Sequence, residues 1–211
     1  MKNRVVVADD HASIRQMLGV VLAREGPYEM VGEAGTGFEA IKQCRKAKPQ
    51  IVVLDLLLPE LNGVEVLRLL RGESKETRFI IYSGTLNRSL IVDALQARPH
   101  GFVHKADELA TFCDALRAVA SGCCFFTPFA TKMMDAERET GSVAVQLTDR
   151  ERAVLQMIAE GMSNKEMACR FAIAPKTVEH HRAQVMQKLG MHDVATLTRY
   201  AVQKGLVTID V

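Results

Sequence analysis

The sequence of 211 residues contains no apolar run near the roughly 20 residues that a membrane-spanning helix requires. Only four apolar residues follow the segment Met1 to Arg4, so we expect no secretory signal peptide. Five cysteines without CxxC spacing argue against a disulfide framework and against a zinc site. The formal net charge of +2 is too small to indicate a nucleic-acid partner by itself. We therefore expect a cytoplasmic protein with reduced thiols and no membrane partner.

Apolar residues make up 48% and charged residues 25% of the chain, which is a globular composition of sufficient length for two domains. The first half alternates short apolar runs with amphipathic stretches, which predicts a parallel α/β sheet covered by helices on both faces. Right-handed crossovers then place the carboxyl ends of all strands at one edge of the sheet. The expected strands are 4–8, 28–34, 51–54, 79–82 and 101–104, and the expected helices are 11–24, 39–46, 64–71, 89–96 and 108–120.

Polar residues stand at the predicted strand ends: Asp9, Asp10, Asp55, Ser83 and Lys105. Three carboxylates in one place repel one another unless a divalent cation neutralises them, and an oxygen-only ligand set suits Mg²⁺. A lysine and a hydroxyl beside the metal can hold a phosphoryl group, while the separate carboxylate of Asp55 can attack phosphorus. Each residue alone could equally be a turn cap or a solvated side chain, so the prediction depends on their convergence.

Two other functions fit the sequence less well. Gly32, Gly35 and Gly37 do not have GxGxxG spacing and follow the second strand, which favours an ordinary turn over a dinucleotide-binding loop. A phosphohydrolase of the DxD type would need an acid two residues after Asp55, where this chain has Leu57. We therefore expect a protein that is not an enzyme.

The alternation of strands and helices stops after residue 122, and the last third of the chain has a different pattern. We predict a first domain over 1–124, a linker over 125–142 and a second domain over 143–211. Thr148 with Glu151 and Ser163 with Glu166 each form a capping-box pattern. A third helix begins at Pro175, so the second domain is predicted to be a helix-turn-helix.

The third helix has one apolar stripe, formed by Val178, Val185 and Leu189. The opposite side suits the DNA major groove, because it combines amide, basic and small side chains. Its members are Lys176, Glu179, His180, Ala183, Gln184 and Gln187, with Lys165, Arg182 and Lys188 as flanking phosphate contacts. A merely solvated polar face is the alternative.

Residues 3–121 resemble the receiver domain of two-component response regulators, through Asp9-Asp10, Asp55-x-x-x-Pro59-x-x-x-Gly63, Ser83, Phe102 and Lys105. The resemblance implies a CheY-like, flavodoxin-like sheet of five strands, with Phe102 as the switch aromatic and Ser83 as the switch hydroxyl. It also implies that Asp10, Asp55 and the backbone carbonyl of Leu57 hold Mg²⁺, with Asp9 acting mostly through water. Ala106 and Pro99 depart from the family pattern.

The second domain resembles the LuxR-type helix-turn-helix, through Leu147-Thr148-x-Arg150-Glu151, Gly161-x-Ser163-Asn164-Lys165-Glu166-x-Ala168 and Lys176-Thr177-Val178-Glu179-x-His181-Arg182. Thr177 thereby joins the candidate DNA contacts. Nearly the whole chain is thus similar to response regulators of the NarL/FixJ family. Ala174 stands where the family often has a serine cap, which weakens the start of the helix by about 1 kcal/mol.

The resemblance implies a transcriptional regulator that binds double-stranded promoter DNA. A sensor histidine kinase would phosphorylate Asp55, and phosphorylation would draw in Ser83, Lys105 and Phe102 and promote a homodimer. A phosphorylation-independent regulator, with the first domain as a dimerisation or partner-binding module, is the alternative. We also hypothesise that the inactive form covers the recognition helix with the receiver.

Overall fold

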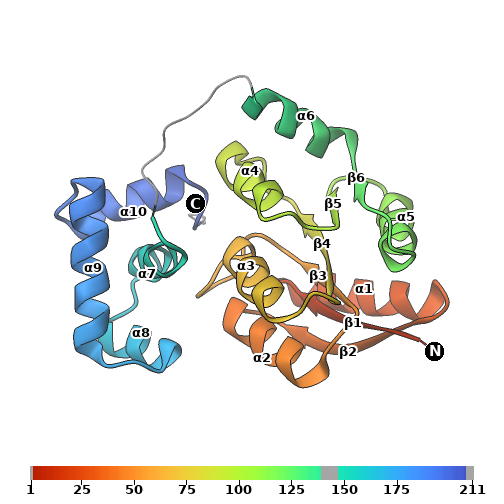
Figure 1. Cartoon of the computed structure of the whole chain (residues 1–211), viewed down its shortest axis with the longest axis horizontal. Helices are drawn as coiled ribbons and strands as arrows, with labels where there is room; N and C mark the ends of the chain where they lie inside the picture. The colour runs from red at the N-terminus through yellow and green to blue at the C-terminus, as the bar shows by residue number, and fades with distance from the viewer. Residues whose placement is uncertain (1, 139–146, 208–211) are drawn as a thin grey trace.

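The computed structural model describes residues 2–138 and 147–207, and for 134–138 it describes the backbone alone. The chain folds into an α/β domain followed by a smaller domain of helices (Figure 1). Throughout the described ranges, every helix is too short or too polar to cross a bilayer.

The α/β domain is built on one parallel sheet with the strand order β2-β1-β3-β4-β5-β6. This confirms the predicted doubly wound fold, but the prediction of five strands was one too few. The sixth strand pairs with β5 over only two residues, which is too short to give a recognisable strand pattern. The strands are β1 (Asn3–Ala8), β2 (Tyr28–Ala34), β3 (Ile51–Leu54), β4 (Arg78–Ser83), β5 (Gly101–His104) and β6 (Phe125–Phe126).

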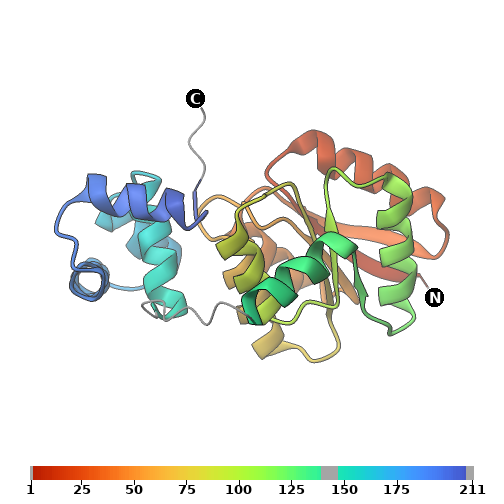
Figure 2. The ribbon, with the colours of Figure 1, turned by 90° about the horizontal axis from the view of Figure 1, so that it is seen from above.

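Helices cover both faces of the sheet (Figure 2), which explains why β3 and the last four residues of β1 are apolar and buried. Val5 and Val7 pack with residues of α1 and α5, whereas Val6 between them packs with residues of α2 and α3. The helices of this domain are α1 (Ala12–Arg24), α2 (Gly37–Ala47), α3 (Gly63–Glu73), α4 (Arg88–Gln96) and α5 (Leu109–Ala120).

The chain leaves β1 for β2 on one side and returns to β3 on the other, so the direction of winding changes between β1 and β3. In open α/β sheets, ligands bind in the crevice outside the carboxyl ends of the strands at such a point. Asp9 follows β1 and Asp55 follows β3. The topology therefore places both carboxylates at that crevice.

The second domain contains α7 (Asp149–Ala159), α8 (Asn164–Phe171), α9 (Pro175–Leu189) and α10 (Val194–Gln203). Both predicted capping boxes are present, since Thr148 and Ser163 accept from the amides of Glu151 and Glu166, whose carboxylates accept in return. Ala174 provides no side-chain cap to α9, as predicted. The helices enclose a separate apolar core that includes Val154, Val178 and Leu197.

Helix α6 (Pro128–Arg138) lies between the two domains in the sequence, and it packs beside α4 (Figure 2). Residues 125–138 of the predicted linker are thus a strand and a helix that extend the α/β domain. The remainder of the predicted linker, 139–142, lies outside the described residues.

Candidate functional site

Adjacent parallel strands bring the predicted polar residues to one edge of the sheet. Ala8 pairs with Leu54, so the next residues, Asp9 and Asp55, lie side by side. The amide of Asp55 donates to the carbonyl of Ala8 at 2.9 Å, and the amide of Lys105 donates to the carbonyl of Ser83 at 3.0 Å. Backbone hydrogen bonds within the sheet therefore position these four side chains.

The carboxylate of Asp55 is 4% exposed and lies between two donors. The Ser83 hydroxyl donates to Oδ1 of Asp55 at 2.5 Å, and Lys105 Nζ donates to Oδ2 at 2.6 Å. The backbone amide of Leu57 adds a longer hydrogen bond to Oδ1, at 3.3 Å. These donors would lie beside any group that became attached to an Asp55 oxygen.

Lys105 also binds Asp9, with 2.7 Å between its Nζ and Oδ2 of that carboxylate. Burial lowers the pKa of Lys105, but the carboxylates of Asp55 and Asp9 more than offset this effect and raise the pKa overall. Burial raises the pKa of Asp9, and Lys105 opposes that rise. One protonated lysine thus compensates two buried carboxylates.

Asp10 is exposed, and it lies beside two basic residues that were not predicted from the sequence. His11 Nδ1 lies 2.6 Å from Oδ1 of Asp10 and 3.5 Å from Oδ1 of Asp9. The Arg15 guanidinium donates to the backbone carbonyls of both aspartates, at 2.8 and 3.2 Å. His11 could have been predicted, because it directly follows the acidic pair in the sequence. Arg15 could not be recognised in this way, because one helical turn separates it from the pair.

The side chains that could bind a metal at this edge of the sheet suit a hard divalent cation. Ligand atoms of Asp9, Asp10 and His11 lie within 4.8 Å of one another. Three carboxylates against Lys105 and the Arg15 guanidinium still leave an excess of negative charge, and carboxylate and carbonyl oxygens are the ligands that Mg²⁺ prefers. The residues therefore fit the predicted ion.

Of the two predicted switch residues, Ser83 contacts the site and Phe102 lies in the apolar core. Ser83 is fully buried and directs its hydroxyl at Asp55. The Phe102 ring is also fully buried, inside the core between the sheet and α4. Both side chains thus already point inwards, as was predicted for the phosphorylated form.

Helix α9 has the predicted division into two faces. Val178 and Val185 are fully buried, and Leu189 is partly buried against the same core. The exposed candidates on α9 are Lys176, Thr177, Glu179, His180, Ala183, Gln187 and Lys188, and Lys165 on α8 is exposed as well. Arg182 and Gln184 are half-buried, and Lys188 Nζ is engaged with Glu151 at 2.8 Å.

Family models match both halves of the chain. The response regulator receiver domain matches residues 5–117, and the luxR family of bacterial regulatory proteins matches residues 145–201. The chain is a LuxR-family response regulator. Both matched domains are regulatory and not enzymatic, and together they fit a transcriptional regulator.

Two relatives match this response regulator over nearly its whole length, and two solved structures resemble it. The putative positive transcription regulator BvgA of Bordetella pertussis is 31% identical over 98% of this chain and 100% of its own length. A putative transcriptional regulator of Pseudomonas aeruginosa is 30% identical over 97% of this chain and 100% of its own. The crystal structure of a LuxR-family response regulator from Aurantimonas matches at 28% identity, with a TM-score of 0.60 over 65% of this chain and 99% of its own. RcsB of Salmonella typhimurium has the same fold, with a TM-score of 0.66 and 20% identity over 98% of this chain and 99% of its own.

In this response regulator, α7 binds the loop that directly follows Asp55. Gln156 is 1% exposed; its Oε1 accepts from the amide of Asn62 at 2.7 Å, and its Nε2 donates to the carbonyl of Leu58 at 2.8 Å. The Glu160 carboxylate accepts from the amide of Glu60 at 3.1 and 3.0 Å. None of these contacts was predicted from the sequence.

A charged cluster lies beside these hydrogen bonds. Glu65 is 1% exposed and accepts from Arg152 of α7 at 2.7 Å and from Arg68 at 3.0 Å. Burial raises the pKa of Glu65, and the two arginines oppose that rise. Farther out, Arg170 pairs with Glu60, and Asn87 Nδ2 donates to the carbonyl of Gln203 at 3.1 Å.

The interface between the two domains does not cover α9, the helix predicted to contact DNA. Its described contacts come from α7, α8 and α10, while the outer face of α9 points away from the receiver (Figure 1). The hypothesis that the receiver covers α9 is therefore wrong for this structure.

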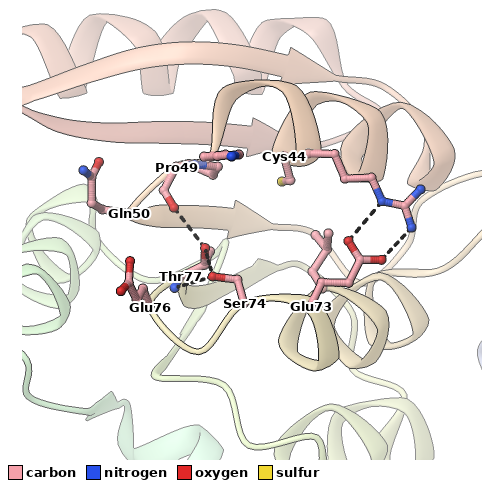
Figure 3. A pocket seen from close by; sticks show the side chains of 10 residues that line it. Cys44, Pro49, Gln50, Glu73, Ser74, Glu76 and Thr77 are labelled. Carbon is pink, nitrogen blue, oxygen red and sulfur yellow. Dashed lines mark hydrogen bonds and ion pairs between the residues drawn. The ribbon is translucent and has the colours of Figure 1, made fainter.

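A cavity of about 370 Å³ lies between the carboxyl ends of α2 and α3 (Figure 3). Arg45 and Glu73 close one side with hydrogen bonds of 3.0 and 2.5 Å. Burial raises the pKa of Cys44 in its wall to about 12, so this thiol is protonated at neutral pH. The cavity adjoins the amino ends of β3 and β4, at the edge of the sheet opposite Asp55.

Proposed function

We propose that this chain is a cytoplasmic transcriptional regulator that binds promoter DNA when a sensor histidine kinase has phosphorylated Asp55. The observation that carries the proposal is the buried Asp55 carboxylate, with Ser83 Oγ at 2.5 Å and Lys105 Nζ at 2.6 Å. Both donors can bind oxygens of a phosphoryl group on Asp55. In the transfer, an Asp55 oxygen bonds to phosphorus while the phosphorus–nitrogen bond of the donor phosphohistidine breaks.

Asp10, Asp55 and the carbonyl of Leu57 would hold Mg²⁺, with Asp9 acting through water. When bound, the ion neutralises charge on the carboxylates and on the phosphoryl oxygens. Lys105 now occupies one oxygen each of Asp55 and Asp9. We therefore expect Lys105 to exchange part of this pairing for a phosphoryl oxygen, because both kinds of oxygen compete for the same ammonium group.

The output is DNA binding by a homodimer. A dimer presents two α9 helices to two half-sites, and linkage of two binding modules raises affinity without any new contact. RcsB, which shares this fold, has been solved bound to promoter DNA in the presence of a beryllium fluoride phosphomimetic. The exposed face of α9 in this chain is compatible with the same kind of ligand.

The test uses the full chain with acetyl phosphate and Mg²⁺. We expect intact mass to increase by one phosphoryl group, the protein to become dimeric in sedimentation, and affinity to rise for a duplex selected by the wild type from a random pool. Asp55→Asn should abolish all three changes, whereas Asp114→Asn, at an exposed carboxylate of α5, should preserve them. The proposal would be refuted if phosphorylation of Asp55 changed neither the oligomeric state in sedimentation nor the affinity for DNA.

A regulator that does not depend on phosphorylation is the second candidate. Its support is that Ser83 already donates to Asp55, Phe102 is already buried and the α9 face is already exposed. This candidate predicts equal DNA affinity for the wild type with and without acetyl phosphate, and for Asp55→Asn.

A further inference from the structure

Helix α6 is seated on the surface formed by α4 and β5. The residues directly before α6 are fixed to β5 by two backbone contacts. Phe126 of β6 pairs with Phe102, and the amide of Thr127 donates to the Phe102 carbonyl at 3.3 Å. The next turn places Ala130 in the apolar core, fully buried together with Leu90 of α4. The segment 125–133 is thus a packed layer of the receiver.

One ring of α6 contacts the switch region directly. The centroid of Phe129 lies 6.4 Å from that of Phe102 and 5.1 Å from that of His104, in an edge-on arrangement with the histidine. His104 immediately precedes Lys105, and its backbone pairs with Ser83 in the sheet. Phe129 therefore touches the switch aromatic and the direct neighbour of the lysine that binds Asp55.

We infer that α6 is the element that couples the switch to the DNA-binding domain, with Phe129 as the coupling residue. The inference rests on the proposed function and adds a route to it. The Phe102 ring is enclosed, so it cannot turn outwards into the space beside β5 unless Phe129 and Ala130 move. An inward Phe102 holds α6 on the receiver, and an outward Phe102 displaces it.

The consequence for the rest of the chain follows from connectivity. Helix α6 is the last described element before the DNA-binding domain, so its displacement changes where that domain is attached. While α6 is seated, it also occupies the α4–β5 surface, which a second copy of the chain then cannot use. We therefore assign the dimer contact of the phosphorylated form to another surface of the receiver.

The first experiment measures backbone hydrogen exchange of the full chain, with and without beryllium fluoride and Mg²⁺. We expect exchange in segment 128–133 to slow when the phosphomimetic binds, and to stay constant in Asp55→Asn. Unchanged exchange in this segment, in a wild type whose Asp55 loop 56–62 responds, would overturn the inference. This outcome is separate from the proposed function, which DNA affinity tests independently.

The second experiment compares Phe129→Ala with Lys132→Ala, an exposed position of the same helix. Allosteric couplings typically change affinity by about 5- to 150-fold. We expect Lys132→Ala to keep the wild-type ratio of DNA affinities between phosphorylated and unphosphorylated protein, and Phe129→Ala to lower it to about one while accepting phosphate normally. Phe129→Leu, which retains apolar volume, should recover part of the ratio. A wild-type ratio in a folded Phe129→Ala protein would overturn the inference.

Discussion

Replacement of Gln156 by leucine should release the DNA-binding domain from the receiver. Leucine retains most of the side-chain volume but offers neither a donor to the Leu58 carbonyl nor an acceptor to the Asn62 amide. Both backbone groups bond to the fully enclosed Gln156 amide across the interface, at 2.8 and 2.7 Å. In the docked form of the variant they would be buried without partners, whereas in the undocked form water would satisfy them.

The magnitude follows from these two groups. A buried polar group without a partner costs about 1–3 kcal/mol, so two of them cost roughly 2–6 kcal/mol. This corresponds to roughly a 30-fold to 20,000-fold shift of the docking equilibrium towards the undocked form. Apolar contacts of the leucine would offset part of this cost, so we expect a shift of the docking equilibrium near the lower end of the range.

Small-angle scattering should show a larger radius of gyration for Gln156→Leu, and hydrogen exchange should show faster exchange in loop 56–62. The matched control is Gln16→Leu, at an exposed glutamine of α1. Wild-type scattering and wild-type protection of the Asn62 amide in Gln156→Leu would refute the reasoning, because the interface would then be held by other contacts.

Two further predictions concern the receiver. Burial, together with Arg71 and Arg78, lowers the pKa of His100 from its ordinary value of 6.5, and its Nδ1 accepts from the Phe79 amide at 3.1 Å. The folded state thus disfavours the protonated ring, so the stabilisation by the neutral ring is present above pH 6.5 and is lost as pH falls through the lowered pKa. Urea unfolding should therefore show that the free energy of unfolding falls less between pH 7 and 5 in His100→Gln than in the wild type. A Cβ on Gly63 would lie 2.0 Å from the backbone oxygen of Asp55, so Gly63→Ala should lower the free energy of unfolding by about 1–3 kcal/mol. Gly72→Ala, with open space around the Cβ in the same helix, should instead raise it by up to about 1 kcal/mol, and equal effects of the two substitutions would contradict the steric argument.

The fold and the residues near Asp55 were accessible from the sequence because they leave local signals. Buried parallel strands are continuous apolar runs, and in this topology the residue after each run must lie at the carboxyl edge. Asp9 and Asp55 follow such runs directly, which is why their proximity could be predicted without coordinates. Helix caps gave equally local signals at Thr148 and Ser163.

The domain interface left no such signal. Gln156 is one amide on an amphipathic helix, and its partners are backbone groups nearly a hundred residues earlier, which have no side-chain identity to recognise. Phe125–Phe126 forms a strand only because β5 is an available edge, and two residues carry no alternation. The ring of Phe129 could equally have faced solvent or another helix until α4 and β5 supplied its surroundings.

The placement of the interface limits what docking can control. Since the outer face of α9 is exposed while α7 is bound to loop 56–62, docking does not block access to DNA. It fixes the position of α9 relative to the receiver, and in a dimer it therefore fixes the separation of two α9 helices. Adjacent half-sites on B-DNA are about 34–36 Å apart, and a rigid pair of domains binds well only when its spacing agrees. Docking at Leu58, Glu60 and Asn62 thus sets the geometry of the pair, because these residues follow Asp55 closely in the chain and their backbone groups bind the DNA-binding domain.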